Sequence, residues 1–132
     1  MGSITYKTYH SFDDLKDRAD EWDAFAAGVG STIYMSYDWC CTWWDHYGKG
    51  KRLVIVVFYN GVNIAALLPM YIDDFRFPFF KIRVARLVGS NIPPKVFDPP
   101  IDEEWSDQIF MTLVRIMSEH WKCDILTYKT VF

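Results

Sequence analysis

The chain has 132 residues, of which 51% are hydrophobic and 18% aromatic, so it has enough apolar side chains for one buried core and too few residues for two. Charged residues make up 23%, acids and bases are interspersed, and the net charge of -3 excludes the basic patches that bind nucleic acid or anionic lipid. Its apolar runs are too short to span a bilayer as helices, so we expect a single domain over residues 1–132 with no membrane span.

The first fifty residues read as one strand and two helices. Residues 3–9 alternate β-branched or aromatic residues with polar ones, which is the pattern of a half-buried strand. Ser11 is an N-cap candidate for a helix that ends at Gly28 or Gly30, with apolar residues on one face. Ser36 is a second N-cap candidate, for residues 37–47. This second helix is apolar almost all round, so it must be covered on more than one side.

The middle of the chain predicts a hairpin. Residues 53–59 and 62–71 are β-rich runs separated by Asn60-Gly61, a pair that favours a turn with positive φ at both positions. Both arms are nearly continuous apolar runs, which indicates a sheet with helices on both faces. We expect a loop from Asp73 to Pro78 and a further strand over 80–88.

The last third predicts a loop, a helix and a strand. Residues 89–100 are dense in turn formers, Asp102 is the N-cap candidate of the final helix, and residues 123–128 read as a strand. The predicted fold class is therefore α/β (α+β), a mixed and mostly antiparallel sheet with helices on both faces.

This order and several local sequences resemble one known family. They are Glu21-Trp22-Asp23-Ala24-Phe25, Ser36-Tyr37-Asp38-Trp39 with Trp43-Trp44, Ala65-Ala66-Leu67-Leu68-Pro69-Met70-Tyr71, Arg86-Leu87-Val88-Gly89 and Asp98-Pro99. They are similar to the cellulose-biosynthesis-associated acetyltransferases of the GNAT superfamily. That family has two GNAT-like halves in tandem, as in Fem-type aminoacyltransferases, with acetyl-CoA assigned to the second half.

The resemblance implies the N-terminal, substrate-side half of a GNAT-type acyltransferase, acting in polysaccharide or cell-envelope biosynthesis on a sugar or cell-envelope acceptor. The expected partner is the second GNAT-like half, or a second copy paired through the C-terminal strand, because the chain stops at Phe132 before the last elements of a GNAT domain. Two alternatives stay open: a non-catalytic binding or assembly module with a degenerate GNAT-like fold, and a small acetyltransferase completed by dimerisation.

The usual diphosphate motif of the GNAT superfamily is degenerate here. The pattern R/Q-x-x-G-x-G/A has its nearest match in Arg86-Leu87-Val88-Gly89-Ser90-Asn91, which ends in Asn. Prolines, which lack the amide donor that a phosphate requires, stand before the next helix, at positions 93, 94, 99 and 100. We therefore expect no acetyl-CoA site, and no other cofactor, in this chain alone.

Four residues are candidates for binding an acceptor. Trp39 and Trp43, with Trp44 and Tyr47, form an aromatic stripe that either stacks on a sugar or acyl group or fills the core; the spacing is more typical of a buried face. Strict alternation places Arg86 on the apolar face of its strand, unless the strand ends early or a bulge shifts the phase. Arg86 either pairs with Asp98 or emerges at the strand end, and Asp98 either accepts a substrate proton or caps a turn.

The cysteines and histidines do not predict a catalytic or metal site. Cys40 and Cys41 lie five or six positions from His46, which is the wrong spacing for one stripe of a helix, and no cation is near to lower a thiol pKa. The three Cys and three His are too scattered for zinc. Three cysteines and no signal peptide favour a reducing cytoplasm. No catalytic residue is identified.

Overall fold

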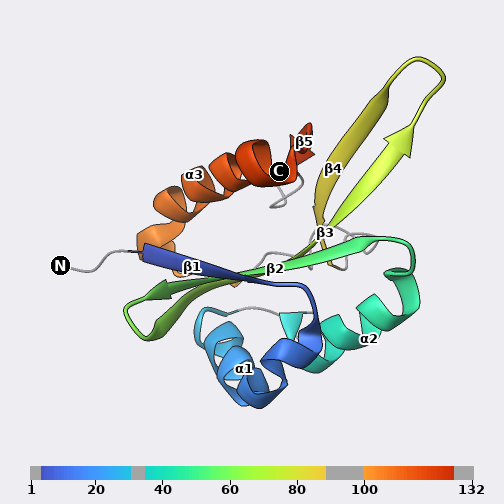
Figure 1. Ribbon diagram of the computed structural model, residues 1–132. Coiled ribbons are helices and arrows are strands. Elements are labelled where there is room, and N and C mark those ends of the chain that lie inside the picture. Colours follow the sequence, from blue (N-terminus) through green and yellow to red (C-terminus); the bar gives the residue numbers. More distant parts are fainter. Residues whose placement is uncertain (1–3, 31–34, 89–99, 127–132) are drawn as a thin grey trace.

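Figure 1 shows the computed structural model, which describes residues 4–30, 35–88 and 100–126. In these residues a five-stranded sheet, in the order β1-β2-β3-β4-β5, lies between two helical layers. Strands β1 to β4 pair antiparallel, and β5 pairs parallel with β4. The predicted mixed sheet with helices on both faces is thus confirmed. The elements are β1 (Ile4–Tyr9), the 3-10 helix η1 (Phe12–Arg18), α1 (Ala19–Gly28), α2 (Tyr37–Tyr47), β2 (Arg52–Asn60), β3 (Asn63–Arg76), β4 (Lys81–Leu87), the 3-10 helix η4 (Glu103–Trp105), α3 (Ser106–Ile116), the π-helical turn η5 (Met117–Trp121) and β5 (Ile125–Leu126).

The sheet separates two hydrophobic cores, because alternate residues of a strand point to opposite faces. Helix α3 covers one face, and η1, α1 and α2 cover the other (Figure 1). The apolar runs of β2 and β3 are buried on both faces, as expected for a sheet with helices on each side. On β2 the α3 face carries Val54, Val56 and Phe58, and the α1–α2 face carries Leu53, Ile55 and Val57.

Both predicted N-caps of the first helical layer are confirmed. The Ser11 hydroxyl accepts a backbone N–H two residues on, and the Ser36 hydroxyl accepts one three residues on. Between the two helices, the buried Trp22 indole donates to the Met35 carbonyl at 2.8 Å. Helix α2 is capped at Gly48, as predicted. The two caps and the Trp22–Met35 hydrogen bond therefore fix the position of α1 relative to the start of α2.

The β2–β3 hairpin is confirmed, but its turn lies one residue later than predicted. Asn60 pairs with Asn63, so Gly61 and Val62 are the turn residues. Among Asn60, Gly61 and Val62, only Gly61 has a positive φ, 66°, as in turns that take glycine at their first central position. The expectation of two positive φ values at Asn60-Gly61 was wrong, since the strand pairing extends through Asn60.

The predicted loop from Asp73 to Pro78 is largely strand. β3 continues to Arg76, which pairs with Lys81 on β4, so the two strands form a long hairpin that extends away from the helices (Figure 1). Arg83 Nε donates to Asp74 Oδ1 at 2.8 Å across the pair, and this bond favours strand over loop in a polar segment. Four exposed phenylalanines near the tip form what we name the aromatic arm: Phe75, Phe77, Phe79 and Phe80.

Strand β4 leaves the edge of β3 at a proline. The Val88 N–H donates to the Pro69 carbonyl at 2.7 Å, but Pro69 has no N–H to return the bond, so the ladder ends here. The same edge is occupied again further along, where Ile101 pairs with Ala66. On this edge of β3, Met70 pairs with Leu87 of β4 and Ala66 pairs with Ile101.

The final helix begins at its predicted cap and ends in a wide turn. Asp102 Oδ1 accepts the Glu104 N–H at 3.1 Å. The π-helical turn η5 ends at Lys122, whose φ of 54° is left-handed. Of the strand predicted over 123–128, Ile125 and Leu126 form β5, and residues 127 and 128 lie outside the described ranges. None of the helices in those ranges combines the length and apolarity that a bilayer crossing requires.

Candidate functional site

The aromatic stripe of α2 faces the sheet. Trp43 is buried, with its ring centroid 5.4 Å from that of Tyr71 on β3, and Trp39 is half-buried between the two cores. The exposed aromatic of this helix is Tyr47, which lies 5.2 Å from Trp43. Trp43 therefore acts mainly as core, and the part of the stripe that faces solvent is at its C-terminal end.

Arg86 lies directly across from Tyr71 in the β3–β4 pair. Its guanidinium carbon is 5.9 Å from the Tyr71 ring centroid, and Nη1 is 3.9 Å from Asp73 Oδ2. The pairing runs without a shift along all of β4, so Arg86 shares the face of Val84. The two exceptions considered from sequence, an early strand end and a bulge, are both wrong, because Tyr71 and Asp73 provide the polar and aromatic contacts that hold a cation on this face.

These contacts bring two of the four sequence candidates together around a residue that the sequence did not single out. We name Trp43, Tyr71, Asp73 and Arg86 the Tyr71 corner. The Arg86 side chain is 32% exposed, which leaves guanidinium donors available for an acidic or hydroxyl-bearing ligand. Asp98 lies outside the described residues, so its pairing with Arg86 stays a prediction. From the sequence, Tyr71 could be identified only as a residue of the predicted hairpin.

The cysteines have the wrong environment for nucleophiles. Cys40 is fully buried, and burial raises the pKa of its thiol. Burial is also the main cause that raises the pKa of Cys41, where a hydrogen bond with Tyr37 opposes the shift. His46 Nδ1 lies 2.9 Å from the carbonyl of Thr42 in its own helix. Across residues 4–30, 35–88 and 100–126, no group of three or more His, Cys, Asp and Glu side chains converges on a metal site.

The start of the last helix does not fit the diphosphate of acetyl-CoA. The Asp102 N–H donates to the Ala65 carbonyl at 2.8 Å, and the Glu104 N–H is taken by the Asp102 side chain. Glu103 and Glu104 are exposed in the first turn, where their carboxylates repel an anion. Pro100, which precedes this turn, has no amide donor. Occupied amides and adjacent carboxylates thus replace the donors that hold a diphosphate in other helix termini.

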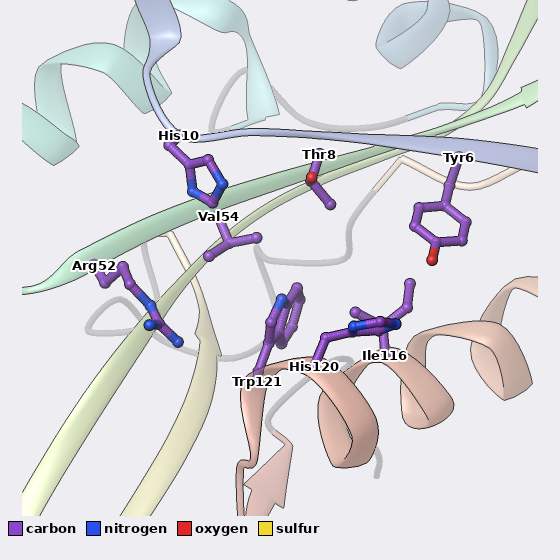
Figure 2. A pocket seen from close by; sticks show the side chains of 8 residues that line it. All are labelled: Tyr6, Thr8, His10, Arg52, Val54, Ile116, His120 and Trp121. Atoms are coloured by element: carbon purple, nitrogen blue, oxygen red, sulfur yellow. The ribbon is translucent and has the colours of Figure 1, made fainter.

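A second polar site lies on the opposite face of the sheet, where β1 meets the end of α3. Figure 2 shows side chains from β1, from the start of β2 and from η5 extending toward one another. They line a cavity of about 410 Å³, which we name the β1–α3 groove: Tyr6, Thr8, His10, Arg52, Val54, Ile116, His120 and Trp121. No sequence pattern predicted this groove, because His10 and His120 lie at opposite ends of the chain.

Comparisons with known proteins identify the fold. No protein-family model and no curated protein matches the sequence. Among solved structures, a ribosomal-protein-alanine N-acetyltransferase from Brucella melitensis biovar Abortus 2308 aligns with a TM-score of 0.50 and 8% identity, over 98% of this chain and 81% of that one. A glucosamine-6-phosphate N-acetyltransferase from Arabidopsis thaliana aligns at 0.47 and 15% (96% and 83% covered), and a GCN5-related N-acetyltransferase from Ralstonia eutropha JMP134 at 0.45 and 12% (97% and 84%). With its mixed sheet and two helical layers, the chain has a fold similar to that of the N-acetyltransferase from Brucella melitensis.

Proposed function

We propose that this chain is the acceptor-binding half of a GNAT-type acyltransferase, in which a second GNAT-like half, or a second copy joined through the C-terminal strand, holds acetyl-CoA. The observation that carries the proposal is the start of the last helix. The Asp102 and Glu104 amides are bonded within the chain and the first turn is acidic, in a fold similar to that of an N-acetyltransferase. Because these two amides are not free for a diphosphate, we assign the acceptor to this chain.

The Tyr71 corner is our candidate for acceptor binding. Arg86 supplies guanidinium donors, and the Tyr71 ring holds this cation on the face of the sheet. Trp43 packs against the Tyr71 ring, whereas Trp39 and Asp98 stay candidates from the sequence alone. An amino sugar or another hydroxyl-rich acceptor fits a guanidinium beside aromatic rings. By resemblance we assign the acceptor to polysaccharide or cell-envelope biosynthesis and the protein to the cytoplasm.

The first experiment asks which half of the reaction the chain binds. Acetyl-CoA is added to the chain in a thermal unfolding assay, and we expect no change in the midpoint, since a ligand of the folded state must raise it. A rise at saturating acetyl-CoA contradicts the proposal.

The second experiment asks where an acceptor binds. Glucosamine is titrated into the ¹⁵N-labelled chain, and we expect shifts at Tyr71, Asp73 and Arg86 that disappear in Arg86→Gln. Arg115→Gln, which removes an exposed cation from α3, is the matched control and keeps the shifts. Shifts that survive Arg86→Gln contradict the assignment of the Tyr71 corner.

The alternative is a non-catalytic binding module with the same fold. The β1–α3 groove favours it, because this cavity lies on the opposite face of the sheet from the Tyr71 corner. Binding in the groove, with no response to acetyl-CoA or glucosamine, is the result that selects this alternative.

A further inference from the structure

The lining of the β1–α3 groove consists of polar side chains around an apolar floor. Val54, Ile116 and Trp121 are buried and form the floor. The polar side chains around it are two hydroxyls, two imidazoles and one guanidinium, and no carboxylate lines the cavity among the described residues: Tyr6, Thr8, His10, Arg52 and His120. The chain as a whole has more acidic than basic residues, 17 against 14, whereas the lining of this groove contains Arg52 and no acidic residue.

The groove is open because α3 covers only part of its face. Its buried residues pack on β2, β3 and β4, and they leave the side chain of Tyr6 on β1 41% exposed. The π-helical turn η5 then ends the helix against the sheet, where Arg83 Nη1 donates to the Trp121 carbonyl at 3.0 Å. The wall that carries His120 and Trp121 is therefore anchored to β4.

His10 is held in one tautomer. Its Nδ1 lies 3.1 Å from the Leu53 carbonyl, and a carbonyl only accepts, so Nδ1 carries the proton. The other ring nitrogen, Nε2, is left for the groove, where the imidazole extends toward Val54 and Trp121 (Figure 2). In this tautomer Nε2 has a lone pair, so it accepts a hydrogen bond, such as one from the P–OH of a phosphate monoester.

Arg52 adds a cation that is not neutralised by an ion pair in the described part of the chain. It is the first residue of β2, and its side chain extends toward the side of the groove where Trp121 lies (Figure 2). Asp74 is bound by Arg83 Nε at 2.8 Å, and this hydrogen bond is the main cause that lowers the pKa of Asp74, to which Arg52 adds. The guanidinium therefore keeps its paired donors for a ligand.

From this arrangement we propose that the β1–α3 groove binds a small phosphate monoester. The phosphate lies between Arg52, His10 and His120, with the Thr8 and Tyr6 hydroxyls as further donors, and the organic part contacts the floor at Trp121. A guanidinium matches two phosphate oxygens at once, the hydroxyls donate to a further oxygen, and His10 Nε2 accepts from the P–OH of the monoester. The cavity volume of about 410 Å³ exceeds that of a phosphate group and accommodates an organic part of about monosaccharide size.

The test is a ¹⁵N NMR titration of the chain with glycerol 3-phosphate and with inorganic phosphate. We expect saturable shifts at Thr8, His10, Arg52 and His120, with glycerol 3-phosphate the tighter ligand. Arg52→Gln is expected to weaken binding at least tenfold. The side chain is exposed, so the fold is kept, and an unchanged thermal midpoint verifies this.

Controls distinguish a built site from general attraction to cations. Arg115→Gln removes the same charge from the exposed face of α3 and is expected to change the dissociation constant less than twofold. Malonate replaces the phosphate by carboxylates and is expected to bind at least tenfold more weakly. The proposal is overturned if Arg52→Gln and Arg115→Gln weaken binding equally, if the shifts map outside the groove, or if malonate binds as tightly as glycerol 3-phosphate. None of these outcomes depends on the Tyr71 corner or on acetyl-CoA.

Discussion

Trp22 allows the packing of the α1–α2 layer to be tested quantitatively. Its side chain is 2% exposed, and its indole donates to the Met35 carbonyl at 2.8 Å. In Trp22→Phe that carbonyl loses its donor, which costs about 1–3 kcal/mol. The smaller ring also removes roughly 40 Å² of buried apolar surface, worth about 1 kcal/mol. We therefore expect the free energy of unfolding to fall by about 2–4 kcal/mol.

Urea unfolding followed by far-UV circular dichroism measures this loss without relying on tryptophan fluorescence. Trp44→Phe is the matched control, because Trp44 is only half-buried and its indole makes no hydrogen bond within the described part of the chain. We expect the control to lose less than about 1 kcal/mol. Equal losses in the two variants would refute the role given to the Trp22–Met35 hydrogen bond.

Three further predictions test local features. A Cβ at Gly48 meets the Trp44 ring at 2.4 Å, so Gly48→Ala is expected to lose about 1–3 kcal/mol in urea unfolding, whereas Gly28→Ala, with no atom within 4 Å, gains up to about 1 kcal/mol. Burial raises the pKa of Tyr59 to about 12, so the folded state favours the neutral phenol, and the stabilisation present below pH 10 is lost as the pH rises from about 10 to 12. Tyr59→Phe is therefore expected to lose less stability than the parent between about pH 10 and 12, and an equal loss contradicts this cause. Phe79 is 97% exposed, so Phe79→Ser should leave the thermal midpoint unchanged while raising solubility measured by light scattering; a lower midpoint shows that the ring is packed.

Much of the fold was predictable because its signals are local. The caps at Ser11, Ser36 and Asp102 each bond an amide two or three residues away, so sequence spacing alone reveals them. The apolar runs of β2 and β3 likewise indicate a sheet covered on both faces. These signals predict the elements and their layers without any knowledge of distant contacts.

The features that sequence reasoning missed depend on partners far along the chain. Asp74 reads as a loop residue until its bond to Arg83 on the neighbouring strand is known. Tyr71 becomes the centre of a corner only because the strand pairing places Arg86 opposite it. Likewise, the β1–α3 groove arises from packing of the two ends of the chain, and no short-range pattern encodes it.

The proline in β3 has a practical consequence for engineering. The Val88 N–H donates to the Pro69 carbonyl and the Pro100 carbonyl accepts from the Leu67 N–H, so both residues are bonded to the same strand. Because these two hydrogen bonds are independent of each other, we expect a foreign peptide inserted between Val88 and Pro100 to leave both of them, and the two hydrophobic cores, in place.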